Sequence, residues 1–306
     1  MGASASREPP KAVVSETTAD VHDVQVPAWL SDLRRERRPR YRTDAYRFDE
    51  LIRALVKQPS WPEGSPGDGP LEMIHDVGPT GALPATAPRF GKIMHAFRHA
   101  GWKMPPEWRL AMRPGEERRS FKAFQTTPEW IAFMEAYARF VREEVAPLCG
   151  DPAGVVYQCP PTLRIAMPSV APTIALHRDR EYPRHQPAEI NFWVPVTAVA
   201  GNSALWVESD PDVGDFHPAD MEPGTFLMFD GHNCRHVTKP NDTGRTRVSF
   251  DFRVVPQSLY VEVLGQGGKR KMGDYFVDST GPVELIGRGG GGEQTTLGRI
   301  QRYFYK

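Results

Sequence analysis

Apolar residues follow a helical period in the first half of the chain. They recur at helical spacing in "RFDELIRALVKQ" (47–58) and in "TPEWIAFMEAYARFVREEVAPLCG" (127–150). In the second segment, Thr127 is a candidate N-cap, Pro128 follows it, and Gly150 stands at the end. These patterns predict helices over both segments. A further helix is predicted in "FGKIMHAFRHAGW" (90–102).

From about residue 154 the period changes to that of short strands. The segments are rich in β-branched and aromatic residues, and turn residues separate them. They are "VVYQ", "TLRIAMPS", "TIALHRD", "AEINFWVPVT", "SALWVES", "GTFLMFDG", "CRHVTKP" and "RTRVSFDFRVV". A series of short strands with regular turns predicts a barrel or a double-sheet jelly roll rather than a helical bundle.

The two patterns suggest three regions. We expect a disordered tail over residues 1–26, because the tail is polar and rich in small residues. A helical lobe that packs on the core is expected over 27–150. A mainly β core with a C-terminal extension, which contains the Gly-rich run 287–294, is expected over 151–306. The Pro/Gly-rich loop 59–87 is either a substrate lid or an insertion.

Composition restricts the partners. The chain has 306 residues with 38 basic and 38 acidic side chains, so its formal net charge is zero. This balance argues against nucleic acid and against anionic membranes as partners. Three separated cysteines without a C-x-x-C pair indicate a reducing compartment, and we expect a cytoplasmic location. The sequence leaves the oligomeric state open.

Membrane association is limited to one candidate signal. The most apolar stretch, 190–207, contains Asn, Pro and Gly and is too interrupted for a membrane helix. "MGASAS" fits an N-myristoylation pattern at Gly2, although a tail of small residues explains the same letters. A single acyl chain gives only a weak, reversible anchor.

A His-x-Asp pair marks a candidate metal site. His177 and Asp179 stand in an apolar run that resembles a strand, where residues i and i+2 point to the same face. Imidazole and carboxylate suit a divalent metal that prefers N and O ligands. His236, in the strand after "FLMFDG", completes a two-histidine, one-carboxylate set of the kind that non-haem Fe(II) oxygenases use. His232 is the competitor, but it stands in the turn.

The segment "RTRVSFDFR" alternates strictly. Polar residues fall on one face (Arg245, Arg247, Ser249, Asp251 and Arg253) and apolar residues on the other. A half-buried strand with a solvated face explains this alternation. Alternatively, Arg247 and Ser249 lie in a pocket and bind the distal carboxylate of a dicarboxylic cosubstrate, with Arg245 as the alternative clamp.

Four other residues have open assignments. Asn191 either hydrogen-bonds the cosubstrate or is a satisfied core amide. Arg164 either clamps an anionic substrate or pairs with a carboxylate. Trp193 is either a core aromatic residue or a substrate contact. His185 follows a proline in a polar loop, where we expect it to be exposed to solvent.

In combination these motifs resemble a known family. "HRD", "EINFWVPVT", "NSALWVESDP", "GTFLMFDG", "RHVTKPN" and "GRTRVSFDFRV" are similar to those of the Fe(II)/2-oxoglutarate-dependent oxygenases, in particular the StrG-like streptomycin-biosynthesis group near the phytanoyl-CoA-dioxygenase-like branch. The resemblance covers about residues 160–256. It implies a double-stranded β-helix, iron ligands at His177, Asp179 and His236, and a cosubstrate-binding Arg247. Val237 departs from the glycine that many relatives have after the last histidine.

The resemblance also implies an activity. It predicts a dioxygenase that consumes O2 and converts 2-oxoglutarate to succinate and CO2 while it hydroxylates a small molecule of biosynthetic or secondary metabolism. Ascorbate is a candidate reductant. Two alternatives remain at this stage. One is a jelly-roll binding or scaffold protein, and the other is a cupin-type metalloenzyme that does not use 2-oxoglutarate.

Overall fold

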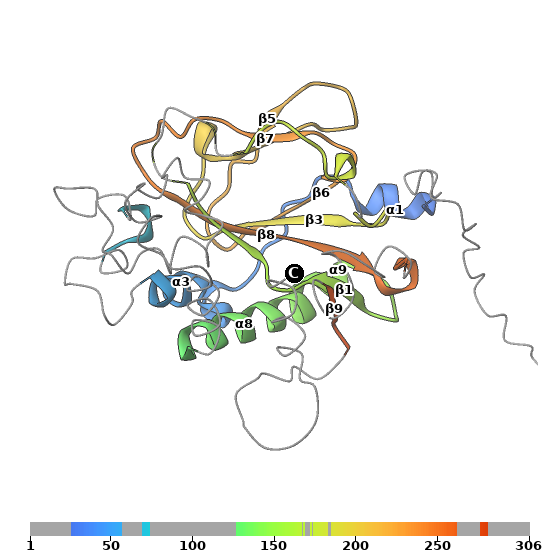
Figure 1. Cartoon of the computed structure of the whole chain (residues 1–306), viewed down its shortest axis with the longest axis horizontal. Helices are drawn as coiled ribbons and strands as arrows, with labels where there is room; N and C mark the ends of the chain where they lie inside the picture. Colours follow the sequence, from blue (N-terminus) through green and yellow to red (C-terminus); the bar gives the residue numbers. More distant parts are fainter. Residues whose placement is uncertain are drawn as a thin grey trace, which may run out of the picture.

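Antiparallel strands form the centre of the described part of the molecule, and a layer of helices covers one side of them (Figure 1). The structure is a computed structural model, and it describes residues 26–56, 69–73, 127–166, 168, 172, 174–182, 185–261 and 276–280. The expectations for the helix at 90–102, the Gly-rich run 287–294 and most of the tail 1–26 and the loop 59–87 therefore lie outside the described residues. The division into three regions stays a prediction.

The helices follow the apolar spacing of the sequence. They are α1 (Ala28–Leu33), α2 (Thr43–Tyr46), α3 (Phe48–Val56), α8 (Pro128–Phe140) and α9 (Ala146–Cys149), with a π-helical turn at Val141–Val145 and a 3-10 turn at Leu71–Met73. Thr127 caps α8 by accepting a hydrogen bond from the Trp130 backbone N–H. Gly150 ends α9 in the left-handed conformation, at φ 67°. The predicted start and end of the helical segment 127–150 are confirmed, and α3 lies within the predicted segment 47–58, whose last two residues lie outside the described residues.

Two antiparallel sheets contain the strands. The larger sheet has the order β6-β3-β8-β1-β9, with β2 also paired to β8, and the smaller sheet has the order β5-β4-β7. The strands are β1 (Val155–Gln158), β2 (Thr162–Ala166), β3 (Ile190–Pro195), β4 (Leu205–Val207), β5 (His217–Pro218), β6 (Leu227–Phe229), β7 (His236–Thr238), β8 (Arg247–Pro256) and β9 (Phe276–Asp278). The sequence did not predict β5 or β9.

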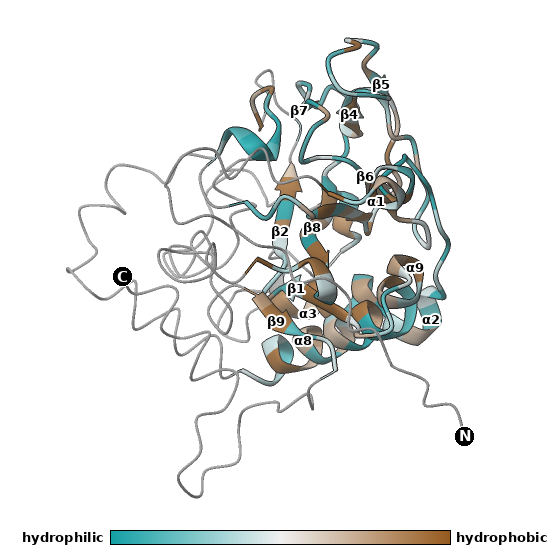
Figure 2. Cartoon of the chain, turned by 90° about the vertical axis from the view of Figure 1, so that its right-hand side faces the viewer, coloured by the Kyte–Doolittle hydropathy of each residue, from teal (hydrophilic) through white to brown (hydrophobic). Residues whose placement is uncertain are grey.

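Strand β8 organises the larger sheet because its ten residues pair with three other strands. One face carries Val248, Phe250 and Phe252, which are fully buried in a core shared with α3 and α8. Phe250 meets Phe48 of α3 edge to face, at 4.9 Å between ring centroids. Figure 2 shows hydrophobic residues concentrated where these helices meet β1, β8 and β9. The polar face of β8 points away from the helices, toward the smaller sheet.

The segment 174–180 differs from its prediction. His177 makes only an isolated bridge to His236, and Asp179 begins a 3-10 turn, Asp179–Glu181. The predicted strand over "TIALHRD" is therefore wrong, because the backbone of this segment bonds to β7 and to the turn before it instead of extending a sheet. Among the described residues, no helix has both the length and the hydrophobicity that crossing a bilayer requires.

Candidate metal and cosubstrate site

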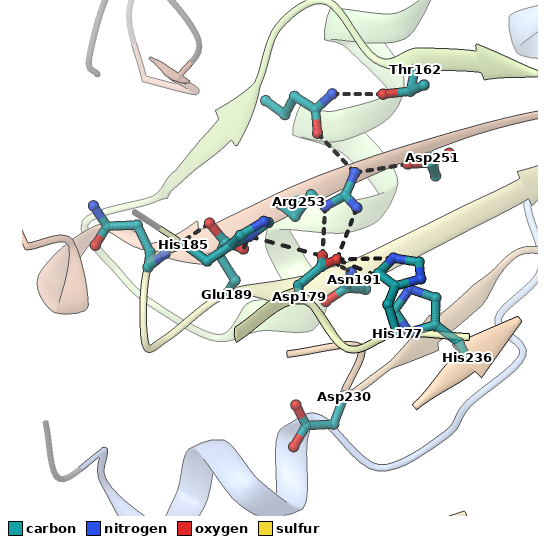
Figure 3. A network of polar contacts seen from close by, with 12 residues as sticks. Thr162, His177, Asp179, His185, Glu189, Asn191, Asp230, His236, Asp251 and Arg253 are labelled. Atoms are coloured by element: carbon teal, nitrogen blue, oxygen red, sulfur yellow. Dashed lines mark hydrogen bonds and ion pairs between the residues drawn. The ribbon is translucent and has the colours of Figure 1, made fainter. Parts of the chain in front are cut away.

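Three predicted ligands meet between the two sheets although their segments are far apart in the chain. His177 and His236 exchange backbone hydrogen bonds, from His177 N to His236 O at 3.2 Å and from His236 N to His177 O at 2.8 Å. The backbone N–H of Asp179 donates to Gly231 O at 2.9 Å, in the turn that precedes β7. Pairing with β7, rather than strand alternation, therefore brings the three side chains together (Figure 3).

The donor atoms converge on one point. The Nε2 atoms of His177 and His236 lie 3.6 Å and 4.0 Å from Asp179 Oδ1, and one ligand atom from each residue lies within 4.8 Å of the others. At metal–ligand distances of about 2.1 Å, donors on one ion are separated by roughly 3 Å when adjacent and roughly 4 Å when opposite. The separations therefore fit a single divalent ion.

Backbone carbonyls set the tautomer of both imidazoles. His177 Nδ1 lies 2.8 Å from Ala175 O, and His236 Nδ1 lies 3.2 Å from Cys234 O. A carbonyl only accepts, so each Nδ1 carries the proton and each Nε2 presents a lone pair to the centre. Burial lowers the pKa of His236 to about 4, which keeps this ring neutral at neutral pH.

Asp179 is ionised despite its burial. It is 1% exposed, and burial by itself raises the pKa of a carboxyl group. The Arg253 guanidinium, with smaller contributions from His185 and His236, outweighs that effect, and together they hold the pKa of Asp179 well below its usual range. The result is a buried carboxylate between two imidazoles, which is a donor set for Fe(II), Mn(II) or a similar cation.

Sequence reasoning missed the partners of this carboxylate. Arg253 Nε donates to Asp179 Oδ2 at 2.9 Å, and Arg253 Nη2 donates to Asp179 Oδ1 at 3.3 Å. Asn191 Nδ2 donates to the same Oδ2 at 2.8 Å. Arg253 was recognisable as a pocket residue, because it continues the polar alternation of β8. Nothing in the local pattern identified its partner, which is 74 residues away.

A small pocket adjoins the metal ligands. Both sheets line it: the larger sheet contributes Asn191, Trp193, Phe229, Arg247, Asp251 and Arg253, and the smaller one contributes Leu205, His236 and Thr238. Arg164 of β2 and His177 also line it. The structure thus brings one metal-ligand cluster and several of the predicted binding residues to a single pocket.

Arg247 is a buried cation without an ion pair among the described residues. It is 3% exposed, its Nη1 donates to Ser203 O at 3.3 Å, and its Nε has no hydrogen-bond partner there. Burial, with a smaller contribution from Arg164, lowers the pKa of Arg247 to about 10. Ser249 Oγ, fully buried two residues along β8, also lacks a hydrogen-bond partner in this part of the chain. Buried donors without a hydrogen-bond partner are suited to binding an anionic ligand.

The remaining predicted residues divide into two groups. Arg164 lines the pocket and forms an ion pair with Asp251, and Trp193 lines it with the Arg247 guanidinium 5.8 Å from its ring centroid. Arg245 is exposed, precedes β8 and is not among the described residues that line the pocket, so its position does not support it as the alternative cosubstrate-binding arginine. The strand starts at residue 247, and the alternation therefore does not extend to residue 245.

His185 corrects another expectation, because it is buried rather than exposed. Its Nδ1 is hydrogen-bonded to Glu189, which is also buried, and lies 3.9 Å from Asp179 Oδ2. This pair packs behind Asp179, on the side away from His177 (Figure 3). His232, the competing ligand, is buried in the turn and is not part of either cluster of candidate metal ligands among the described residues.

Comparisons with known proteins give one informative relative. No protein-family model matches the chain. The streptomycin biosynthesis protein StrG of Streptomyces griseus is 34% identical over 160 residues, which make up 50% of this chain and 76% of that protein.

Similarities to solved structures are weaker. "CytC3 with Fe(II) and alpha-ketoglutarate" has a TM-score of 0.37 at 12% identity, with 80% of this chain and 83% of that chain covered. A nickel complex of the non-heme monooxygenase ThoJ has a TM-score of 0.30 at 14% identity, with 57% and 71% covered. Similarities at these TM-scores do not establish a shared fold, so the sequence relative alone defines the family.

Proposed function

The chain belongs to the family of the streptomycin biosynthesis protein StrG, and from this premise we propose that it is an Fe(II)/2-oxoglutarate-dependent dioxygenase. The observation that carries the proposal is the convergence of His177, His236 and Asp179 beside a pocket that contains Arg247, a buried cation with no ion pair among the described residues. The two facing sheets, with the site between them, support a double-stranded β-helix as the core fold.

Each residue has a distinct task in this proposal. His177, His236 and Asp179 hold iron, which when bound supplies the activation of O2 and the oxidative decarboxylation of 2-oxoglutarate to succinate and CO2. Arg247, with the Ser249 hydroxyl, binds the distal carboxylate of 2-oxoglutarate. A buried guanidinium suits this task because its planar fork matches a carboxylate and its cost of desolvation is already met in the folded protein.

The rest of the pocket receives the substrate. Trp193, Leu205 and Phe229 supply apolar surface, and Arg164 with Asp251 supplies charge. These walls exclude water from the reacting centre. The name of StrG supports a small-molecule substrate from biosynthesis. Hydroxylation of that molecule is the reaction we propose, and ascorbate as a reductant stays a prediction.

An anaerobic titration tests the metal and cosubstrate site. Purified protein with Fe(II) and 2-oxoglutarate, without O2, should develop a weak visible charge-transfer band. His177→Ala and Asp179→Ala should abolish it, and a full-strength band in both variants would refute the ligand assignment. Succinate formed across a substrate library separates an oxygenase from a binding protein. A metal-loaded protein that oxidises substrate without 2-oxoglutarate would favour the cupin-type alternative.

A further inference from the structure

The two oxygens of Asp179 have different surroundings. Oδ1 faces the Nε2 atoms of both histidines, at 3.6 Å and 4.0 Å. Oδ2 accepts hydrogen bonds from Asn191 Nδ2 at 2.8 Å and from Arg253 Nε at 2.9 Å. A carboxylate oxygen has two lone pairs, so these two donors occupy Oδ2. Among the described residues, Oδ1 accepts only the longer bond, 3.3 Å, from Arg253 Nη2, and it keeps a lone pair for a metal.

The Arg253 fork is itself held in place. Its Nη1 donates to Asp251 Oδ1 at 2.7 Å and lies 3.4 Å from Gln158 Oε1. Asp251 in turn forms an ion pair with Arg164 of the neighbouring strand β2. The guanidinium is therefore fixed from two sides, and its Nε–Nη2 edge stays directed at Asp179 (Figure 3).

The position of the Asn191 amide depends on the absence of a side chain at Gly231. A Cβ at Gly231 would lie 2.5 Å from Asn191 Cγ and 2.6 Å from its Nδ2, closer than side-chain packing allows. Asn191 is 4% exposed, so its side chain has little room to retreat. The turn before β7 therefore contributes an empty space as well as a backbone carbonyl, and the amide can approach Asp179 Oδ2 only because that space exists.

We propose that Arg253 and Asn191 are positioning residues that restrict Asp179 to binding the metal through Oδ1 alone, an inference that rests on the proposed metal site. An ion held by two imidazoles and one carboxylate oxygen keeps three of six positions open. If Asp179 bound through both oxygens, one of those positions would be lost. The hydrogen bonds from Arg253 and Asn191 to Oδ2, which we call the Oδ2 clamp, thus preserve room for O2 and for a cosubstrate that binds the metal through two atoms.

Manganese(II) binding to the full chain without cosubstrate tests this clamp. Two quantities are measured: the affinity for Mn(II), and the water-proton relaxivity per bound ion, which reports how many exchangeable waters the ion carries. The variants are Arg253→Met, Asn191→Ala and Gly231→Ala. Arg38→Met is the control, because it removes another ion-paired arginine, bound to Glu36, that does not line the pocket.

We expect Arg253→Met to weaken Mn(II) binding by about 10- to 100-fold, the usual effect of removing an outer partner of a ligand. We also expect its relaxivity to fall by about one third, as three open positions become two. Asn191→Ala and Gly231→Ala keep every charge, so they test the clamp even if Arg253→Met does not fold. Both should weaken binding by about 10-fold, whereas Arg38→Met should change it less than twofold.

Two negative results have different meanings. Wild-type affinity and relaxivity in Arg253→Met, Asn191→Ala and Gly231→Ala would overturn the clamp, while loss of binding in His236→Ala would still support the metal site. If the wild-type protein bound no Mn(II), or only Mn(II) that His236→Ala leaves in place, both the proposed function and the clamp would be refuted. A purely structural role would lower stability without changing the relaxivity of the ions that remain bound.

Discussion

Replacing Arg247 by methionine should stabilise the protein and at the same time destroy its affinity for 2-oxoglutarate. Arg247 is 3% exposed, and within the described residues it has no carboxylate partner. The difference between its usual pKa of 12.5 and a value of about 10 corresponds to roughly 3 kcal/mol for keeping the charge in the folded state. Methionine removes this cost and fills much of the same space.

The gain in stability from Arg247→Met is smaller than the full cost of keeping the buried charge. The hydrogen bond from Arg247 Nη1 to Ser203 O is lost, which offsets about 1 kcal/mol. We therefore expect the free energy of unfolding to rise by about 1–2 kcal/mol. Two charge-assisted hydrogen bonds to a carboxylate contribute about 3–6 kcal/mol, so 2-oxoglutarate should bind roughly 100- to 10,000-fold more weakly.

Urea unfolding of the ligand-free protein measures the first quantity, and calorimetric titration of the Mn(II)-loaded protein with 2-oxoglutarate measures the second. Arg164→Met is the control for stability: it leaves the part-buried Asp251 with one partner fewer and should lower the free energy of unfolding. If Arg247→Met were as destabilising as Arg164→Met, or if it bound 2-oxoglutarate like the wild type, the reasoning from an unpaired buried cation would be refuted.

Three further measurements test the buried groups near the site and the cap of helix α8. Burial lowers the pKa of His232 to about 4, below its unfolded value, so stability is full above pH 6.5 and is lost as the pH falls toward 4. Between pH 7 and pH 5, His232→Gln should therefore lose about 2 kcal/mol less than the wild type in urea unfolding, and equal slopes would contradict this. Glu189→Ala leaves the buried His185 without its partner and should cost about 3–5 kcal/mol of unfolding free energy, whereas a cost below 1 kcal/mol would mean that the pair contributes little. Thr127→Ala removes the N-cap of α8 and should cost about 1 kcal/mol, with Thr127→Ser as the variant that retains the cap.

The local sequence pattern was sufficient to predict the elements whose apolar and polar residues recur at helical or strand spacing. The apolar stripe of 127–150 gave α8 and its cap, and strict alternation in 247–253 separated the polar pocket face of β8 from its core face. Alternation works here because each side chain of a strand points opposite to its neighbours, whatever the strand packs against. Chemistry of the side chains then identified His177, Asp179 and His236 as a candidate set.

Contacts between distant segments decided the rest. Asp179 lies in a 3-10 turn because its backbone bonds to the turn at Gly231, and His185 is buried because Glu189 and Asp179 surround it. Arg253 looked like any polar residue on an alternating strand until the fold placed it against Asp179. Sequence alone determined which faces are polar. The tertiary structure determined which polar groups meet, because pairing of charges depends on distance in space and not on spacing along the chain.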